Sequence, residues 1–385
     1  MIAYNQQWLS NLNIHEVVDD AFDENCLTAE EQKAIHQQYP VGFYTPNYFI
    51  AIGLLLLTII VMLFSFGLLG FIFREMIEKM IGGLAIFFAI ICYAVLEYMI
   101  QVKKHFNSGV DEGLLWGASI ALFCGISLPN DLSSITNCII IFMISLFGTA
   151  RYADRLMATA LYLSFLGVLF YSCVELGSIG KAIAPFVIMI ASLVSYFIVV
   201  RSGSKPAMIH YRNCLTMIEI VSLVSLYAAG NYFVVRELSN EMFHLHLQPA
   251  ETIPLGWVFW ILTVAIPLSY FAIGIQKKNT ILIRVGLLLF AGIVFTVRYY
   301  HTILPLETMM TVAGIIIFAI AYGLSKWLHE PVHGFTSREI SSKNAMEKLQ
   351  IESLILAQTF KPGTDPGGTK FGGGDFGGGG ASGEY

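Results

Sequence analysis

The chain has 385 residues, of which 56% are apolar and only 13% are charged, and its net charge at neutral pH is −5. Soluble domains carry about 25% charged residues, so the composition excludes an ordinary soluble protein and indicates that the lipid bilayer is the solvent. The charges form no basic stripe with interleaved aromatic residues, so no nucleic-acid partner is predicted.

Residues 1–46 form a polar head, in which we expect two short helices. Apolar residues recur at roughly helical spacing between positions 8 and 22, and Asn25 ends this amphipathic pattern. Thr28 and Glu31 have the spacing of a capping box, which predicts the start of a second helix. No cleavable signal peptide is expected, because no basic segment followed by a short apolar core is present. The head is interpreted as an anchor that lies on the membrane, or alternatively as a docking module.

Residues 47–328 contain ten hydrophobic segments that are candidates for membrane-spanning helices. About 20 apolar residues at about 1.5 Å each cross a hydrocarbon core of about 30 Å. The third and fourth segments are short, and a re-entrant hairpin around Pro129 is the alternative to two spans. The expected fold is therefore all-α, a polytopic transmembrane helix bundle of about ten spans. The segments are residues 48–73, 77–102, 113–128, 135–149, 156–175, 181–200, 213–235, 255–275, 281–297 and 305–327.

The orientation of the bundle follows from its basic residues. Most of the 22 lysine and arginine residues lie in loops on the side of the N-terminus or in the C-terminal tail. The positive-inside rule then places both termini in the cytoplasm. Ten spans are also compatible with two inverted five-helix repeats, as in some secondary transporters.

The C-terminal part of the chain is predicted to be cytosolic. Residues 329–361 have the pattern of an amphipathic helix that begins at a capping box, Thr336 to Glu339. Residues 362–385 are rich in glycine and are expected to be disordered, because they cannot bury enough surface to offset backbone entropy. A cytosolic or membrane protein is the predicted partner of this tail, with three aromatic residues as the candidate partner-binding residues: Phe371, Phe376 and Tyr385.

Two segments near the ends of the chain resemble parts of known families. The head carries the segment NCLTAEEQKAI before the spans, and it resembles uncharacterised bacterial families of predicted multi-pass membrane proteins with a short cytosolic helical head. This resemblance implies the bacterial cytoplasmic (inner) membrane and no activity. The tail segment FGGGDFGGGGASG is similar to the Gly-rich C-terminus of membrane-anchored proteins with a TPM-type domain. That domain itself is absent, so the resemblance implies at most a shared partner for the tail.

Charged residues inside the spans are the candidates for function, because a charge in the bilayer costs about 2.5–3.5 kcal/mol on insertion scales. Glu219 leads, since hydroxyl residues lie near it at helical spacing and form a polar stripe that a solute or proton path needs. A hydrogen-bonded clasp between helices is the alternative. The stripe consists of Glu219, Thr216, Ser222 and Ser225, and the further charged candidates, nearer the helix ends, are Glu97, Glu175 and Arg298.

The sequence contains no pattern that predicts a cofactor or a catalytic centre. His244 and His246 alternate along one loop and are weak zinc candidates without an assigned third ligand. The six cysteines stand singly, so no metal or redox framework is indicated. HExxH and GxSxG motifs are absent as well.

These features favour a non-enzymatic scaffold or accessory subunit that recruits partners through its cytosolic ends. The alternative is a secondary transporter of a small solute with Glu219 in its pathway, and an intramembrane enzyme ranks third. A water-accessible cavity at Glu219 would indicate transport, whereas burial among helices would favour the scaffold.

Overall fold

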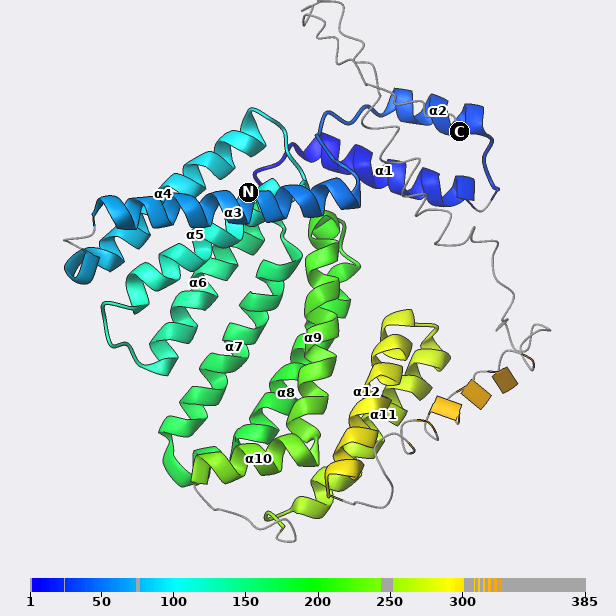
Figure 1. Ribbon diagram of the computed structural model, residues 1–385. Coiled ribbons are helices and arrows are strands. Elements are labelled where there is room, and N and C mark those ends of the chain that lie inside the picture. Colours follow the sequence, from blue (N-terminus) through cyan, green and yellow to red (C-terminus); the bar gives the residue numbers. More distant parts are fainter. Residues whose placement is uncertain are drawn as a thin grey trace, which may run out of the picture. The chain divides into compact units, whose positions relative to one another are not determined.

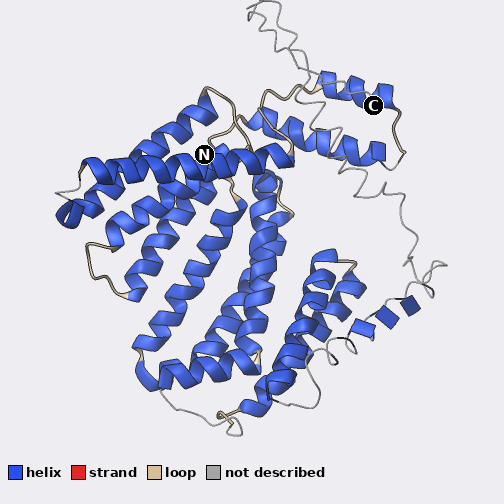
Figure 2. Ribbon diagram, viewed as in Figure 1, coloured by secondary structure: helices blue, strands red, loops and turns tan. Residues whose placement is uncertain are grey.

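The computed structural model describes residues 2–23, 25–73, 77–243 and 252–300, and single positions between 308 and 326. Within these residues every regular element is a helix (Figure 2), and only one isolated bridge, between Tyr44 and His105, pairs extended segments. The all-helical class is therefore confirmed for this part of the chain. The predictions that lie outside it are the helix at 329–361, the tail at 362–385 with its three aromatic residues, most of the span 305–327, and the histidines His244 and His246.

Nine of the described helices are long and apolar enough to cross a membrane, and they coincide with the first nine predicted segments. Even the shortest, with 18 residues, reaches about 27 Å, so the third and fourth segments have the length of full spans. In chain order (Figure 1) the nine are α3 Tyr48–Ile72, α4 Ile77–Gln101, α5 Val110–Ser127, α6 Ser134–Tyr152, α7 Arg155–Glu175, α8 Gly177–Gly203, α9 Arg212–Gly230, α11 Gly256–Lys277 and α12 Thr280–Tyr300.

The predicted span 213–235 is divided in the structure. Helix α9 ends at Gly230, and a separate helix α10, Tyr232–Phe243, begins after Asn231. Asn231 has an extended backbone, and its side-chain oxygen accepts a hydrogen bond from the Val234 N–H at 3.2 Å, as an N-cap does. Its amide nitrogen donates to Tyr227 Oη and Thr296 Oγ1, both at 2.9 Å. Through these hydrogen bonds, the buried asparagine holds the break between α9 and α10 against Tyr227 of α9 and Thr296 of α12.

Side chains of the described helices form two main apolar cores. The first joins the N-terminal segment to α4 and α5, and the second joins α9 to α11 and α12. Fully buried members include Leu96 of α4 and Leu223 of α9. In contrast, α3 buries none of its residues fully and exposes most of its apolar side chains, which suits a helix with lipid as its neighbour.

The head contains the two expected helices, α1 Gln6–Asp23 and α2 Ala29–Gln38. Between them Asn25 adopts a left-handed backbone with φ of 60°, which ends α1. The expected capping box is confirmed: the Glu31 N–H donates to Thr28 Oγ1 at 3.3 Å, and the Thr28 N–H donates to the Glu31 carboxylate at 2.9 Å.

Loss of this cap is expected to fray α2. Replacing Thr28 by alanine should speed amide hydrogen exchange in residues 29–33 about fivefold, equivalent to about 1 kcal/mol. Hydrogen bonds from Thr28 lower the pKa of the Glu31 carboxyl below its ordinary value of 4.5. The cap is therefore fully present above pH 4.5 and is lost as the pH falls through the lowered value. Equal exchange in the two proteins at neutral pH would contradict this prediction.

Candidate functional site: an apolar groove with a charged mouth

A row of glycines on α5 lets α3 approach it closely. Gly109 directly precedes α5, and Gly113 and Gly117 follow within α5 at steps of four residues, so all three lie where α3 approaches. A Cβ atom on Gly109 would collide with the Ala51 carbonyl oxygen of α3, and one on Gly113 would lie 3.1 Å from Thr58 Cγ2. Small residues at this spacing are a common device for packing membrane helices.

Beside this contact lies a groove of about 990 Å³. Its walls come mainly from α3 and α5, and nearly all of them are apolar. Lining residues such as Leu63 and Ile120 are also exposed on the surface, so the groove opens sideways instead of being enclosed. Its apolar part includes Ile52, Leu55, Ile59, Met62, Phe66, Ile120, Ala121 and Cys124.

One end of the groove is polar, and we call this end the mouth. Helices α3, α5, α7 and α9 all begin there, because successive spans alternate in direction. Two carboxylates at this end accept hydrogen bonds from backbone N–H groups near the starts of α5 and α7. Asp154 Oδ1 caps α7 by accepting from the Met157 N–H at 2.7 Å, and Asp111 accepts from the Ser108 N–H at 2.9 Å. The polar residues that line the mouth are Asn107, Glu112, Asp154, Arg155, His210 and Asn213.

Glu112, Arg155 and His210 are ionisable groups of the mouth that have no side-chain partner among the described residues. The carboxylate of Glu112 is partly buried and makes no hydrogen bond there, and Arg155 is exposed and forms no ion pair with it. His210 Nδ1 is buried without a hydrogen bond. The mouth thus presents a carboxyl group, a guanidinium group and an imidazole nitrogen that have no hydrogen-bond or ion-pair partner among the described residues.

Asp154 differs from these three groups, because its carboxyl is held in place. Burial raises the pKa of Asp154, although the hydrogen bond from the Met157 N–H favours the charged form. The Cys214 thiol also donates to the Asp154 main-chain oxygen at 3.4 Å. Asp154 therefore connects the starts of α7 and α9, and it contributes structure to the mouth.

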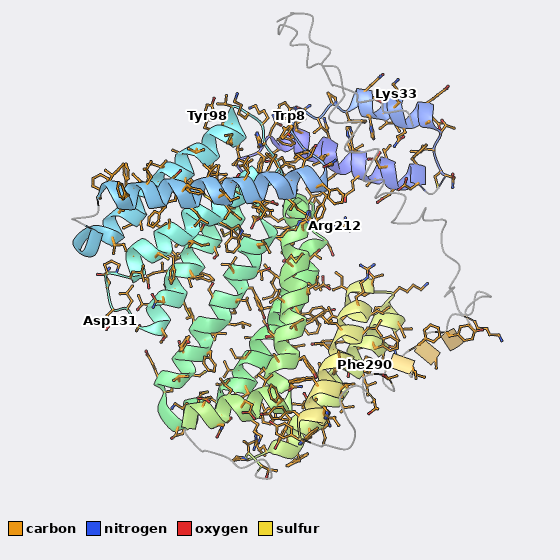
Figure 3. The ribbon with its side chains drawn as sticks, viewed as in Figure 1. Trp8, Lys33, Tyr98, Asp131, Arg212 and Phe290 are labelled. Carbon is orange, nitrogen blue, oxygen red and sulfur yellow. The ribbon has the colours of Figure 1, made fainter. Side chains whose placement is uncertain are left out.

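The N-terminal segment packs over the same end of the bundle. The Tyr4 hydroxyl donates to Asp111 Oδ2 at 3.2 Å, and the Ala3 N–H donates to the Arg151 carbonyl at 2.7 Å. Trp8 (Figure 3) meets Phe43 edge-to-face at 5.2 Å between ring centroids. Burial and the Asp111 carboxylate raise the pKa of Tyr4 well above its usual value, so it remains a donor. Because Tyr4 and Leu9 line the groove, the head forms part of the site.

Glu219, the leading sequence candidate, lies away from the groove. It is only 8% exposed, and its Oε1 atom has no hydrogen-bond partner in the described part of the chain. Asn279, at the turn between α11 and α12, is a polar side chain that interacts with the carboxyl. The neighbouring α9 residues Asn213 and Met217 line the groove, but Glu219 does not.

The hydroxyl stripe beside Glu219 does not form a chain of hydrogen bonds to its carboxylate. Ser222 is fully buried, and its hydroxyl donates to the main-chain oxygen of Glu219 at 2.7 Å. Thr216 and Ser225 are half-buried. In the described structure the stripe is therefore a set of hydroxyl groups on α9 that lie near the buried Glu219 carboxyl without a hydrogen bond to it.

The remaining charged candidates occupy different environments. Glu97 Oε1 accepts from Arg151 Nε at 2.7 Å and from Tyr152 Oη at 2.6 Å, which ties α4 to α6 as a clasp. Glu175 is exposed at the end of α7, and Arg298 is half-buried on α12. Among the ion pairs between described residues, none joins Glu175 to Arg298.

Sequence reasoning missed the groove, although part of its signal was present. The spacing of Gly109, Gly113 and Gly117 is readable from the sequence and indicates a close helix contact. Glu112 and Arg155 were absent from the candidates because each lies at the edge of a predicted span, where charges are common.

The fold and the site together define a polytopic helical membrane protein with a lateral, amphipathic groove. No protein-family model matches the chain, and no curated protein or solved structure matches it either. Its function is therefore argued from the site alone.

Proposed function

We propose that this protein is a non-enzymatic membrane protein that holds an amphiphile, with the hydrocarbon tail in the groove and the polar head group at the mouth. The observation that carries the proposal is the gradient along one groove, from apolar walls on α3 and α5 to the polar groups around Glu112 and Arg155. Ligand sites are mostly apolar, with a few placed polar groups that orient the ligand.

The size and opening of the groove support this assignment. A volume of about 990 Å³ lies at the upper end of the range of small-molecule sites, about 300–1,000 Å³. The sideways opening along exposed residues of α3 gives a bilayer amphiphile a direct path, because no polar barrier separates Ile59 or Leu63 from lipid. With both termini in the cytoplasm, as expected for a bacterial inner-membrane protein, the mouth faces the cytosolic leaflet.

A role as a scaffold or accessory subunit is compatible with this proposal. The head is bound to the bundle through Tyr4 and Ala3, which leaves the C-terminal tail as the proposed contact for a protein partner. Its aromatic residues Phe371, Phe376 and Tyr385 support that assignment by sequence alone. The alternative of solute transport through Glu219 gains no support from the groove, because Glu219 does not line it.

A photoactivatable phospholipid with a diazirine in its acyl chain tests the proposal. In the intact protein we expect cross-links to α3 and α5 that cluster on the groove-lining residues. Replacing Ile59 by tryptophan fills the groove and should reduce these cross-links about fivefold or more. This corresponds to a loss of about 1 kcal/mol in the binding free energy of the lipid.

The adjacent residue provides the matched control for this experiment. Ile60 is similarly exposed but does not line the groove, so Ile60→Trp should leave the labelling unchanged. Labelling spread evenly over the exposed faces of all helices, with equal yields in the two variants, would refute the proposal.

A further inference from the structure

The mouth carries a carboxyl group, Glu112, and a guanidinium group, Arg155, that form no ion pair with each other. From this we propose that the preferred amphiphile is a zwitterionic phospholipid whose head group has a phosphate and a primary ammonium group, as in ethanolamine phospholipids. This inference rests on the proposed function and specifies the ligand of the same groove.

Glu112 is the proposed contact for the ammonium group. It lies in the first turn of α5 and lines the mouth, and its carboxylate makes no hydrogen bond to a described residue. A partly buried carboxylate is stabilised by a charged donor, which forms a shorter and stronger hydrogen bond than a neutral one. A primary ammonium group carries three N–H donors, so it can bond Glu112 and still reach a second acceptor.

His210 supplies a suitable second acceptor. Its Nδ1 atom is buried, lines the same mouth and has no hydrogen-bond partner among the described residues. A neutral imidazole offers one nitrogen as an acceptor. A quaternary ammonium group has no N–H donor and would leave both Glu112 and His210 without a hydrogen bond, which favours ethanolamine over choline.

Arg155 is the proposed contact for the phosphate. Its side chain lies at the start of α7 and lines the mouth, and it forms no ion pair with a described carboxylate. Guanidinium groups bind phosphate through paired N–H donors.

The apolar groove selects a lipid over a free phosphate or a small zwitterion. A free head group would contact only the polar mouth. A lipid also has an acyl chain, which fills the apolar space along Leu55, Ile59 and Ile120. The proposal is therefore committed to a membrane lipid as the occupant.

The test uses the full-length protein in nanodiscs with trace photoactivatable lipids that share the same acyl chains and differ in the head group: ethanolamine, choline or glycerol. We expect the ethanolamine lipid to label the groove about tenfold more than the other two lipids. This is the difference in binding expected from one additional charge-assisted hydrogen bond. Glu112→Gln should remove the preference for ethanolamine over glycerol. Arg155→Gln should reduce labelling by all three lipids.

Two exposed residues outside the groove serve as charge-matched controls. Glu30→Gln and Arg201→Gln remove the same charges elsewhere and should leave the preference intact. Groove labelling that is blocked by Ile59→Trp but equal for the three head groups, or strongest for choline or glycerol, would overturn this inference and leave the proposed function standing. The absence of groove labelling by any lipid would overturn both.

Discussion

Replacing Gly109 by alanine is expected to separate α3 from α5 and to lower the free energy of unfolding by about 3 kcal/mol or more. Gly109 has φ of +84°, a backbone conformation that residues with a side chain rarely adopt. The new Cβ atom would also meet the Ala51 carbonyl oxygen, with Leu55 N only 2.9 Å away. Backbone atoms cannot rotate aside as a side chain does, so the helices must move apart.

Gly53 is the control for this substitution. It is also a glycine of α3, but it is exposed, and a Cβ atom there meets nothing within 4 Å. Gly53→Ala should therefore be neutral or slightly stabilising, because alanine is the better helix former. Unfolding midpoints in detergent micelles measure both changes. A Gly109→Ala protein as stable as Gly53→Ala would show that α3 does not pack against α5 as described.

Replacing Asp111 by alanine is expected to release the head from the bundle and to cost about 4 kcal/mol. Asp111 is only 3% exposed, and it accepts from Tyr4 Oη at 3.2 Å, Asn107 N at 3.0 Å, and Ser108 N and Oγ at 2.9 and 2.8 Å. Its removal leaves these donors without their acceptor, and a buried unsatisfied donor costs about 1–3 kcal/mol. Faster hydrogen exchange in residues 2–23 would report the release.

Two milder variants make this second prediction specific. Asp111→Asn keeps the shape but replaces one acceptor oxygen by a donor, so its effect should be smaller than that of alanine. Tyr4→Phe removes one hydrogen bond and keeps the ring contacts with Phe43 and Phe106, so it should cost only about 1 kcal/mol. The opposite order, with Tyr4→Phe the most damaging, would place the attachment of the head in the aromatic cluster instead.

Hydropathy was sufficient to predict the nine long apolar helices of the described residues. A segment such as α3 is apolar on every side, which few soluble helices are, so the described spans were found within a few residues of their ends. The capping box at Thr28 and the break at Asn25 were also readable, because both depend on neighbours in the sequence. Asn231 was missed, since a single asparagine inside an apolar run breaks a helix only when tertiary partners such as Thr296 hold it.

The site was less predictable, because its parts are far apart in the sequence. Tyr4 and Asp111 are 107 positions apart, and neither residue type announces such a contact in one sequence. Glu219 is buried on α9 and does not line the groove, and neither fact can be read from the sequence because both depend on how the helices pack. Glu112 and Arg155 became candidates only when the alternating direction of the spans placed the starts of α5 and α7 at one mouth.

The most direct test of the central claim is an electron cryomicroscopy map of the protein in nanodiscs of ethanolamine phospholipid. We expect elongated density in the groove between α3 and α5, with its polar end between Glu112 and Arg155. A groove closed by the side chains of α3, or lipid density confined to the outer belt around the bundle, would contradict the claim.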